Sequence, residues 1–188
     1  MVSFHFTSLV HIYDEAHNIK QFSTNLRLSA KIDTEIQDIL NKMLADSHSN
    51  RSYLFRYHNG LAAVNGIPFF FQTNTHEVIS PGTQRLMQFY QRIPASLTPM
   101  MNQKFAQNEC VVLNHIDKST DIQLLYFYQS RNTKAMIRCP IFMGDGDLWG
   151  FVGIDFSNEQ NPDKLSNDKT IVLNAAMDLT KIFSSFKK

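Results

Sequence analysis

The chain has 188 residues, 43% of them hydrophobic and 12% aromatic, so it is long enough to bury one well-packed core. Its 18 lysines and arginines and 17 acidic residues leave a formal net charge of +1, with no long block of like charge. This balance argues against a bulk-charge role on nucleic acid or on a membrane surface, and no apolar run is long enough to cross a bilayer.

The two cysteines, Cys110 and Cys139, lie far apart in apolar, strand-like segments. We therefore expect reduced, buried thiols rather than a disulfide framework. The N-terminus has no basic segment followed by a long apolar run, so no signal peptide is visible. Together these features predict a soluble, cytoplasmic protein.

The N-terminal part is predicted to be helical. Residues 1–18 form an extension or a short helix, and residues 19–46 form the first long helix. Across Ile19–Met43 apolar residues recur every three or four positions, which indicates an amphipathic helix with a narrow apolar seam. The polar run Ser47–Asn50 ends it, because small polar side chains compete for backbone hydrogen bonds.

Residues 51–156 are predicted to form the sheet and its pocket. Arg51–Tyr57 is a strand rich in aromatic residues, and His58-Asn59-Gly60 closes it, since Asn-Gly favours tight turns. Phe69–Ile79 is the next strand region. Short elements follow, with helices at Leu86–Ile93, Ser96–Gln107 and Asp121–Ser130 and a strand at Cys110–Leu113.

Lys134–Phe156 is the most informative stretch, because it reads as two apolar strands joined by a Gly144–Asp147 turn. A polar loop containing Pro162 follows, and a second amphipathic helix is predicted at residues 165–186. The apolar seam of that helix runs along Ile171–Phe186.

This order of elements resembles that of a GAF-like sensory domain. The resemblance rests on the strand and turn Arg51–Gly60 and on the unit Arg131–Phe156, with its Pro140-Ile141 and Gly150-Phe151-Val152-Gly153-Ile154 motifs. It implies an α+β, GAF/PAS-like fold with a central, mainly antiparallel sheet of five or six strands. The N- and C-terminal helices pack on one face, and helices and loops form a pocket on the other. It also implies one free-standing domain over residues 1–188, without an output domain.

Arg138 is the most anomalous residue, because it sits inside an apolar strand where an unpaired charge is costly. Asp155 in the partner strand is its candidate mate. One interpretation makes Arg138 an anchor for an anionic ligand, since a guanidinium offers forked donors to carboxylate or phosphate. The alternatives are a structural ion pair between Arg138 and Asp155, or an arginine at a strand edge that reaches solvent.

Other polar and aromatic side chains are candidates for contacts with a ligand, each with an ordinary structural alternative such as turn chemistry, an exposed edge strand or core packing. They are Arg56, His58, Asn59, His76, Tyr128 and Trp149. A metal site made of His58, His76 and Glu77 lacks any short ligand spacing, and Gly144–Asp147 fits a turn better than a calcium loop. We expect no catalytic residue and no metal.

The sequence thus favours a non-catalytic module that binds a small, anionic or nucleotide-like ligand and forms a homodimer through the helices Ile19–Met43 and Ile171–Phe186. No nucleic acid and no membrane are expected as partners, and the cofactor is unknown. A scaffold or inhibitor that binds a protein partner is the alternative. A thiol-dependent enzyme like the free methionine-R-sulfoxide reductases is disfavoured, because Ser130–Thr133 stands where that family places its reactive cysteine.

Overall fold

The protein was analysed as a computed structural model that describes residues 3–62, 68–116 and 128–185. The chain divides into residues 1–36, whose described part is the beginning of helix α1, and residues 37–188, which contain the sheet. Within the described residues, no helix is both long enough and apolar enough to cross a bilayer.

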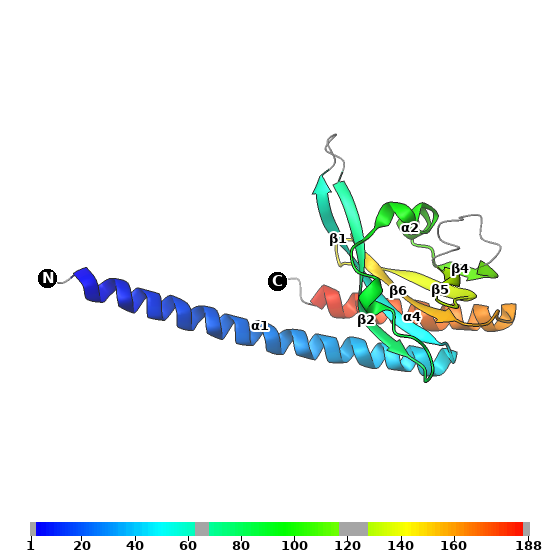
Figure 1. The fold of residues 1–188 in the computed structure, drawn as a ribbon, viewed down its shortest axis with the longest axis horizontal. Coiled ribbons are helices and arrows are strands. Elements are labelled where there is room, and N and C mark those ends of the chain that lie inside the picture. The colour runs from blue at the N-terminus through cyan, green and yellow to red at the C-terminus, as the bar shows by residue number, and fades with distance from the viewer. Residues whose placement is uncertain (1–2, 63–67, 117–127, 186–188) are drawn as a thin grey trace. The chain divides into compact units, whose positions relative to one another are not determined.

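The described elements follow one another along the chain as in Figure 1. They are α1 (Ser3–Ser47), β1 (Arg51–Ala62), β2 (Pro68–Ile79), η1 (Met87–Phe89), β3 (Ile93–Pro94), η2 (Ala95–Leu97), α2 (Pro99–Ala106), β4 (Val111–Asn114), β5 (Ala135–Phe142), β6 (Leu148–Phe156) and α4 (Pro162–Ser185). Helix α1 is continuous, so the predicted extension at residues 1–18 is part of it from Ser3 onward. It ends where expected, because His48 has a positive φ and the Ser47 hydroxyl donates back to the Met43 carbonyl.

Within the described residues, six strands form one antiparallel sheet in the order β3-β2-β1-β6-β5-β4. This confirms the predicted α+β architecture and strand number. The terminal strands β1 and β6 lie side by side at the centre, which brings the two predicted motifs of the sequence together. Side chains alternate between the two faces of the sheet, so each strand serves two separate cores.

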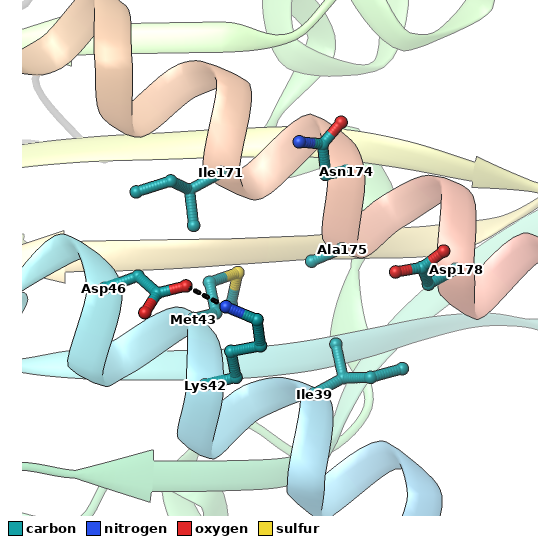
Figure 2. A pocket seen from close by; sticks show the side chains of 8 residues that line it. All are labelled: Ile39, Lys42, Met43, Asp46, Ile171, Asn174, Ala175 and Asp178. Atoms are coloured by element: carbon teal, nitrogen blue, oxygen red, sulfur yellow. Dashed lines mark hydrogen bonds and ion pairs between the residues drawn. The ribbon is translucent and has the colours of Figure 1, made fainter.

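One face is covered by α4 and by the part of α1 from Gln37 onward. Helix α4 packs on β5 and β6, and the Ser52 hydroxyl of β1 donates to the Leu40 carbonyl of α1. Leu40, Val172 and Leu179 are fully buried in this apolar layer. Figure 2 shows the two helices side by side in front of the strands.

The opposite face carries α2 (Figure 1). An aromatic cluster is buried on that face. Phe55 of β1 stacks on Phe151 of β6, with ring centroids 4.8 Å apart, and Phe105 of α2 packs on the same ring at 5.4 Å. Stacked and tilted ring pairs of this kind stabilise a core beyond the area they bury. This is the face on which the sequence predicted a pocket.

The first hairpin differs from the prediction. His58-Asn59-Gly60 does not close the first strand, because β1 continues to Ala62 and pairs with β2 as far as Asn59–Phe70 and, after an irregularity, Ala62–Pro68. Pairing with β2 thus overrides the local turn preference of Asn-Gly.

The connecting segments also differ. The predicted helix Leu86–Ile93 is a single 3₁₀ turn, η1, followed by β3. The predicted helix Ser96–Gln107 divides into η2 and α2 at Thr98, since Pro99 begins the α-helix at a position where no amide donor is needed. Most of the predicted helix Asp121–Ser130 lies outside the described residues.

The expectation of free thiols is wrong, because Cys110 and Cys139 are bonded to each other. Val111 of β4 pairs with Arg138 of β5, so Cys110 lies directly opposite Cys139, with the two Cα atoms 4.2 Å apart. The two cysteines are 29 residues apart in the sequence, so the sequence alone did not indicate this bond. The pairing of β4 with β5 brings them together.

Gly153, like Gly150 of the same strand, lies where a Cβ atom would clash with a neighbouring strand. It lies between Arg138 of β5 and Tyr53 of β1 in the strand pairing, and it has no side chain to separate them. A Cβ atom at Gly153 would lie 2.7 Å from the Ile137 carbonyl oxygen and 2.9 Å from Arg138 Cγ and Tyr53 Cε2. The bare backbone therefore lets the two long side chains meet above β6.

We expect Gly153→Ala to lower the free energy of unfolding by about 1–3 kcal/mol, because the new methyl group must displace Arg138, Tyr53 or the backbone. Chemical denaturation measures the change. Gly144→Ala is the matched control: it lies in an exposed turn where the new Cβ would be 3.4 Å from its nearest neighbour, so it should change stability by less than about 0.5 kcal/mol. Equal effects of the two variants would contradict this view of Gly153.

Candidate functional site

Arg138 and Asp155, the two residues that stood out in the sequence, lie on the same face of the sheet as the aromatic cluster. Their exposed fractions are 5% and 3%. Asp155 is paired with Met136, two positions from Arg138, so the alternation of side chains directs both toward the α2 face.

The guanidinium of Arg138 is enclosed by aromatic residues. Its Nε donates to the Tyr53 hydroxyl at 2.9 Å, and its Nη1 donates to the Tyr128 hydroxyl at 2.8 Å. Its Cζ also lies 5.3–5.5 Å from the ring centroids of Tyr53, Tyr128 and Phe151. Burial alone would lower the Arg138 pKa, but Tyr128, Tyr53 and Asp155 raise it well above its usual value, so the side chain is charged.

No direct Arg138–Asp155 ion pair forms; the Tyr53 hydroxyl stands between the two residues. It accepts from Arg138 and donates to Asp155 Oδ1 at 2.7 Å. The other carboxylate oxygen, Oδ2, receives Arg51 Nη1 at 3.3 Å and the Thr133 hydroxyl at 3.4 Å. Asp155 therefore forms a direct ion pair with Arg51, whereas the Tyr53 hydroxyl links it to Arg138.

Arg51 extends this network to Glu77 of β2. Arg51 Nε lies 3.4 Å from Glu77 Oε1, and the same carboxylate accepts the backbone amides of Leu86 and Met87 at 2.9–3.1 Å. Two buried guanidiniums are thus matched by two buried carboxylates. Such a network tolerates burial because its charges balance and its lone pairs are used.

Sequence reasoning missed the part that Arg51, Tyr53 and Glu77 take in this network, and considered Glu77 only as a possible metal ligand. Arg51 and Tyr53 were assigned only to an aromatic strand, although their spacing places both on one face. Glu77 carries a usable signal, because it is the only acidic residue between Arg51 and Asn108. A single carboxylate in so long a stretch is a stronger indication of a specific structural or functional role than the polar residues around it.

A polar cleft of about 370 Å³ opens beside this network, where β1 begins and β2 and β6 end. We call it the Arg51–Arg131 cleft, after the two arginines in its wall. Asn50, Thr83, Gln84 and Ser130 are among the other residues that line it. Its size and its convergent polar groups suit a small molecule.

Arg131 is the more exposed of the two arginines. Its guanidinium lies 4.2 Å from the centroid of the Tyr90 ring. Burial lowers the Arg131 pKa, Tyr90 opposes this shift, and the positive charge of Arg51 lowers the pKa further. An anion in the cleft would relieve the repulsion between the two arginines.

The other candidates are divided among different places. Tyr128 belongs to the network, but Trp149 lies on the opposite face of the sheet. It occupies a bulge of β6 and stacks on Phe183 of α4, with centroids 4.0 Å apart. Arg56 lies 5.7 Å from the Trp149 ring and is exposed, so this pair is remote from Arg138.

The polar residues of the first hairpin form no joint site. His58 bonds to the Thr73 hydroxyl at 2.9 Å and His76 to the Thr75 hydroxyl at 3.0 Å, while Glu77 is held in the buried network. Asn59 is exposed. Among the described residues, no three His, Cys, Asp or Glu side chains are grouped closely enough to hold a metal.

No protein-family model matches the chain, and no curated protein matches its sequence. Solved structures do match. The phycocyanobilin-bound GAF domain of a cyanobacterial phytochrome aligns with a TM-score of 0.63 at 14% identity, over 90% of this chain and 95% of that one. A far-red cyanobacteriochrome photoreceptor gives 0.61 at 12% identity, over 90% and 97%. The GAF domain of PixJ from Thermosynechococcus elongatus, in its blue-light-absorbing form, gives 0.60 at 12% identity, over 82% and 88%. The chain therefore has the fold of a GAF domain.

Four tyrosines around the network predict the behaviour of the protein in alkali. The pKa values of Tyr53, Tyr57, Tyr90 and Tyr128 are raised above 10.0, chiefly because burial disfavours the phenolate. The unfolded chain releases these protons from about pH 10, whereas the folded chain retains them. Their contribution to stability is therefore complete below pH 10 and is lost as the pH rises toward the folded-state pKa values.

We expect the free energy of unfolding to fall above pH 10 by about 1.4 kcal/mol per pH unit for each retained proton. Tyrosinate absorbance, recorded together with circular dichroism, measures this linkage. The four tyrosines should ionise only as the protein unfolds. Gradual ionisation of all the tyrosines near pH 10 in a protein that stays folded would contradict the burial of the network.

Proposed function

We propose that the protein is a non-catalytic module, located in the cytoplasm, that binds a small anionic molecule in the Arg51–Arg131 cleft. The observation that carries the proposal is the pair of arginines in the wall of a polar cleft of ligand size. Glu77 and Asp155, the carboxylates that contact Arg51, are buried behind it, and Arg131 lines another part of the cleft wall. A carboxylate or phosphate group, including that of a nucleotide, fits this environment.

Arg138 has a positioning role in this proposal. Its Nε and Nη1 are engaged by Tyr53 and Tyr128, so it orders the wall of the cleft through the network rather than binding the ligand itself. The bond between Cys110 and Cys139 supports a non-catalytic role, because a thiol-dependent reductase needs a free, exposed thiolate.

Arg131→Gln should weaken anion binding at least about tenfold, because a charged, forked donor is lost from the cleft. Native mass spectrometry of the purified protein would detect a co-purified anion, and calorimetric titration with inorganic phosphate and adenosine monophosphate would measure affinity. Arg92→Gln is the matched control, since Arg92 is an exposed arginine whose guanidinium packs on Phe71 instead.

The proposal fails if the wild-type protein carries no anion and binds neither probe. It also fails if the two arginine variants lose affinity equally, because attraction would then come from the overall charge and not from the cleft.

We further propose that the protein is a homodimer through α1 and α4. Figure 2 shows a groove between these helices, with Ile39, Met43, Ile171 and Ala175 along it and the Lys42–Asp46 ion pair at its rim. Asp178 and Lys181 provide a second pair of opposite charges on α4, 2.9 Å apart. A surface that carries both signs beside apolar side chains can pair with a copy of itself.

Ile171 of α4 lines this groove and is partly exposed, so it allows a test that spares the core. Ile171→Glu should convert the dimer to a monomer, as measured by light scattering, because it places a negative charge from each protomer at the proposed contact. Val112→Glu, at an exposed position of β4, should leave the mass unchanged. Ile36 is unsuitable for such a test, since it is 2% exposed and a charge there would impair folding. Equal masses for both variants and the wild type would contradict the proposed interface.

A scaffold that binds a protein partner is the second candidate function. It is favoured by large apolar side chains that are exposed outside the helical seam, on β2, η1, η2 and α2. They are Phe69, Phe70, Phe89, Leu97 and Met100. A partner that binds the wild type but not Phe70→Ser, with the affinity of the protein for anions unchanged, would favour this function.

A further inference from the structure

The bond between Cys110 and Cys139 joins the edge strand β4 to β5, and its two sulfur atoms have unequal environments. Cys139 is fully buried, on the face of the sheet that α4 covers. Cys110 is partly exposed, because it immediately precedes β4, and no strand lies on the outer side of β4 in the described sheet. Of the two bonded cysteines, Cys110 is therefore the one that is open to solvent.

Cys110 lies in the wall of an open groove of about 540 Å³ between the end of α2, β4 and α4. We call this the Cys110 groove. Lys104 and Lys169 line it from two different helices, and Leu173 adds an apolar contact. Glu109 also lines it and lies 3.6 Å from Lys104, so it offsets one of the two positive charges. The groove keeps an excess of positive charge beside Cys110.

We propose that Cys110 is a site of S-thiolation by a small anionic thiol of the glutathione class. The lysines attract the carboxylates of the thiol, as charged clefts concentrate ligands of opposite sign. This is a modification site, and it lies away from the Arg51–Arg131 cleft: the two sites share no lining residue.

The reaction is a thiol–disulfide exchange. The external thiolate attacks Cys110 Sγ, and a new sulfur–sulfur bond forms as the Cys110–Cys139 bond breaks. The electron pair of the broken bond goes to Cys139 Sγ, which takes up a proton from solvent. One disulfide is exchanged for another, so no further oxidant or reductant is needed.

The burial of Cys139 acts on both directions of the exchange. The apolar layer between β5 and α4 disfavours the Cys139 thiolate, so Cys139 is a slow leaving group and, once it has taken up a proton, a slow nucleophile for closing the original bond again. The exchanged protein would thus retain the adduct on Cys110, with β4 freed from its covalent link to β5.

The test uses the folded wild-type chain incubated with glutathione or with cysteamine, a cationic thiol of similar reactivity. The adduct is located by mass spectrometry of peptides after acid quenching. Glutathione should modify Cys110 and leave Cys139 as a free thiol. Replacing both Lys104 and Lys169 by Gln should slow the reaction with glutathione about three- to tenfold and leave the reaction with cysteamine equal or faster. Lys181→Gln, at an exposed lysine outside the groove, is the control.

Several outcomes would overturn the proposal. They are the absence of an adduct in the folded protein, an adduct on Cys139, or lysine variants that slow both thiols alike. In Cys139→Ser, where Cys110 has no partner, iodoacetamide should label Cys110 in the folded protein. Labelling only after addition of denaturant would show that the sulfur is inaccessible and would equally refute the site.

Discussion

The structure depends on one hydroxyl group, that of Tyr53, which accepts from Arg138 and donates to Asp155. This bridge crosses the central strand β6 at Gly153, where the lack of a side chain leaves room for it. It holds a buried cation close to a buried anion without direct contact. A guanidinium that is 5% exposed is tolerable only in such a setting, because each neighbouring charge and dipole offsets part of its lost hydration.

The network also explains how the Arg51–Arg131 cleft is built. Arg51 is fixed by Asp155 on one side and Glu77 on the other, and Glu77 in turn binds the amides at the start of η1. Arg51 Nη2 donates to the Gln84 carbonyl in the loop that lines the cleft. Buried charges therefore fix this wall of the cleft, and in the proposed function the ligand contacts Arg131, which packs on Tyr90. Preorganised charges of this kind lower the cost of binding an anion.

Much of the fold was accessible from the sequence, because alternation of apolar residues and amphipathic seams report the faces of strands and helices directly. The anomaly of Arg138 was visible for the same reason, but the expected direct pair with Asp155 is replaced by a link through the Tyr53 hydroxyl. The Tyr53 bridge was not visible, since it requires the register of three strands. The bulge that turns Trp149 toward α4 and the Cys110–Cys139 bond were hidden for the same reason. The turn predicted at Asn59-Gly60 was wrong because the pairing of β1 with β2 outweighs the local turn preference of these two residues.

The most direct test of this account is a double-mutant cycle between Tyr53→Phe and Arg138→Met, with the free energy of unfolding measured by chemical denaturation. If the hydroxyl and the guanidinium act as one unit, the double variant should be more stable than the sum of the single losses predicts. The coupling energy should be about 1–3 kcal/mol, because removing either partner already abolishes the shared hydrogen bond. Strictly additive losses would show that Tyr53 and Arg138 act independently, and the network could then not be what orders the centre of the sheet.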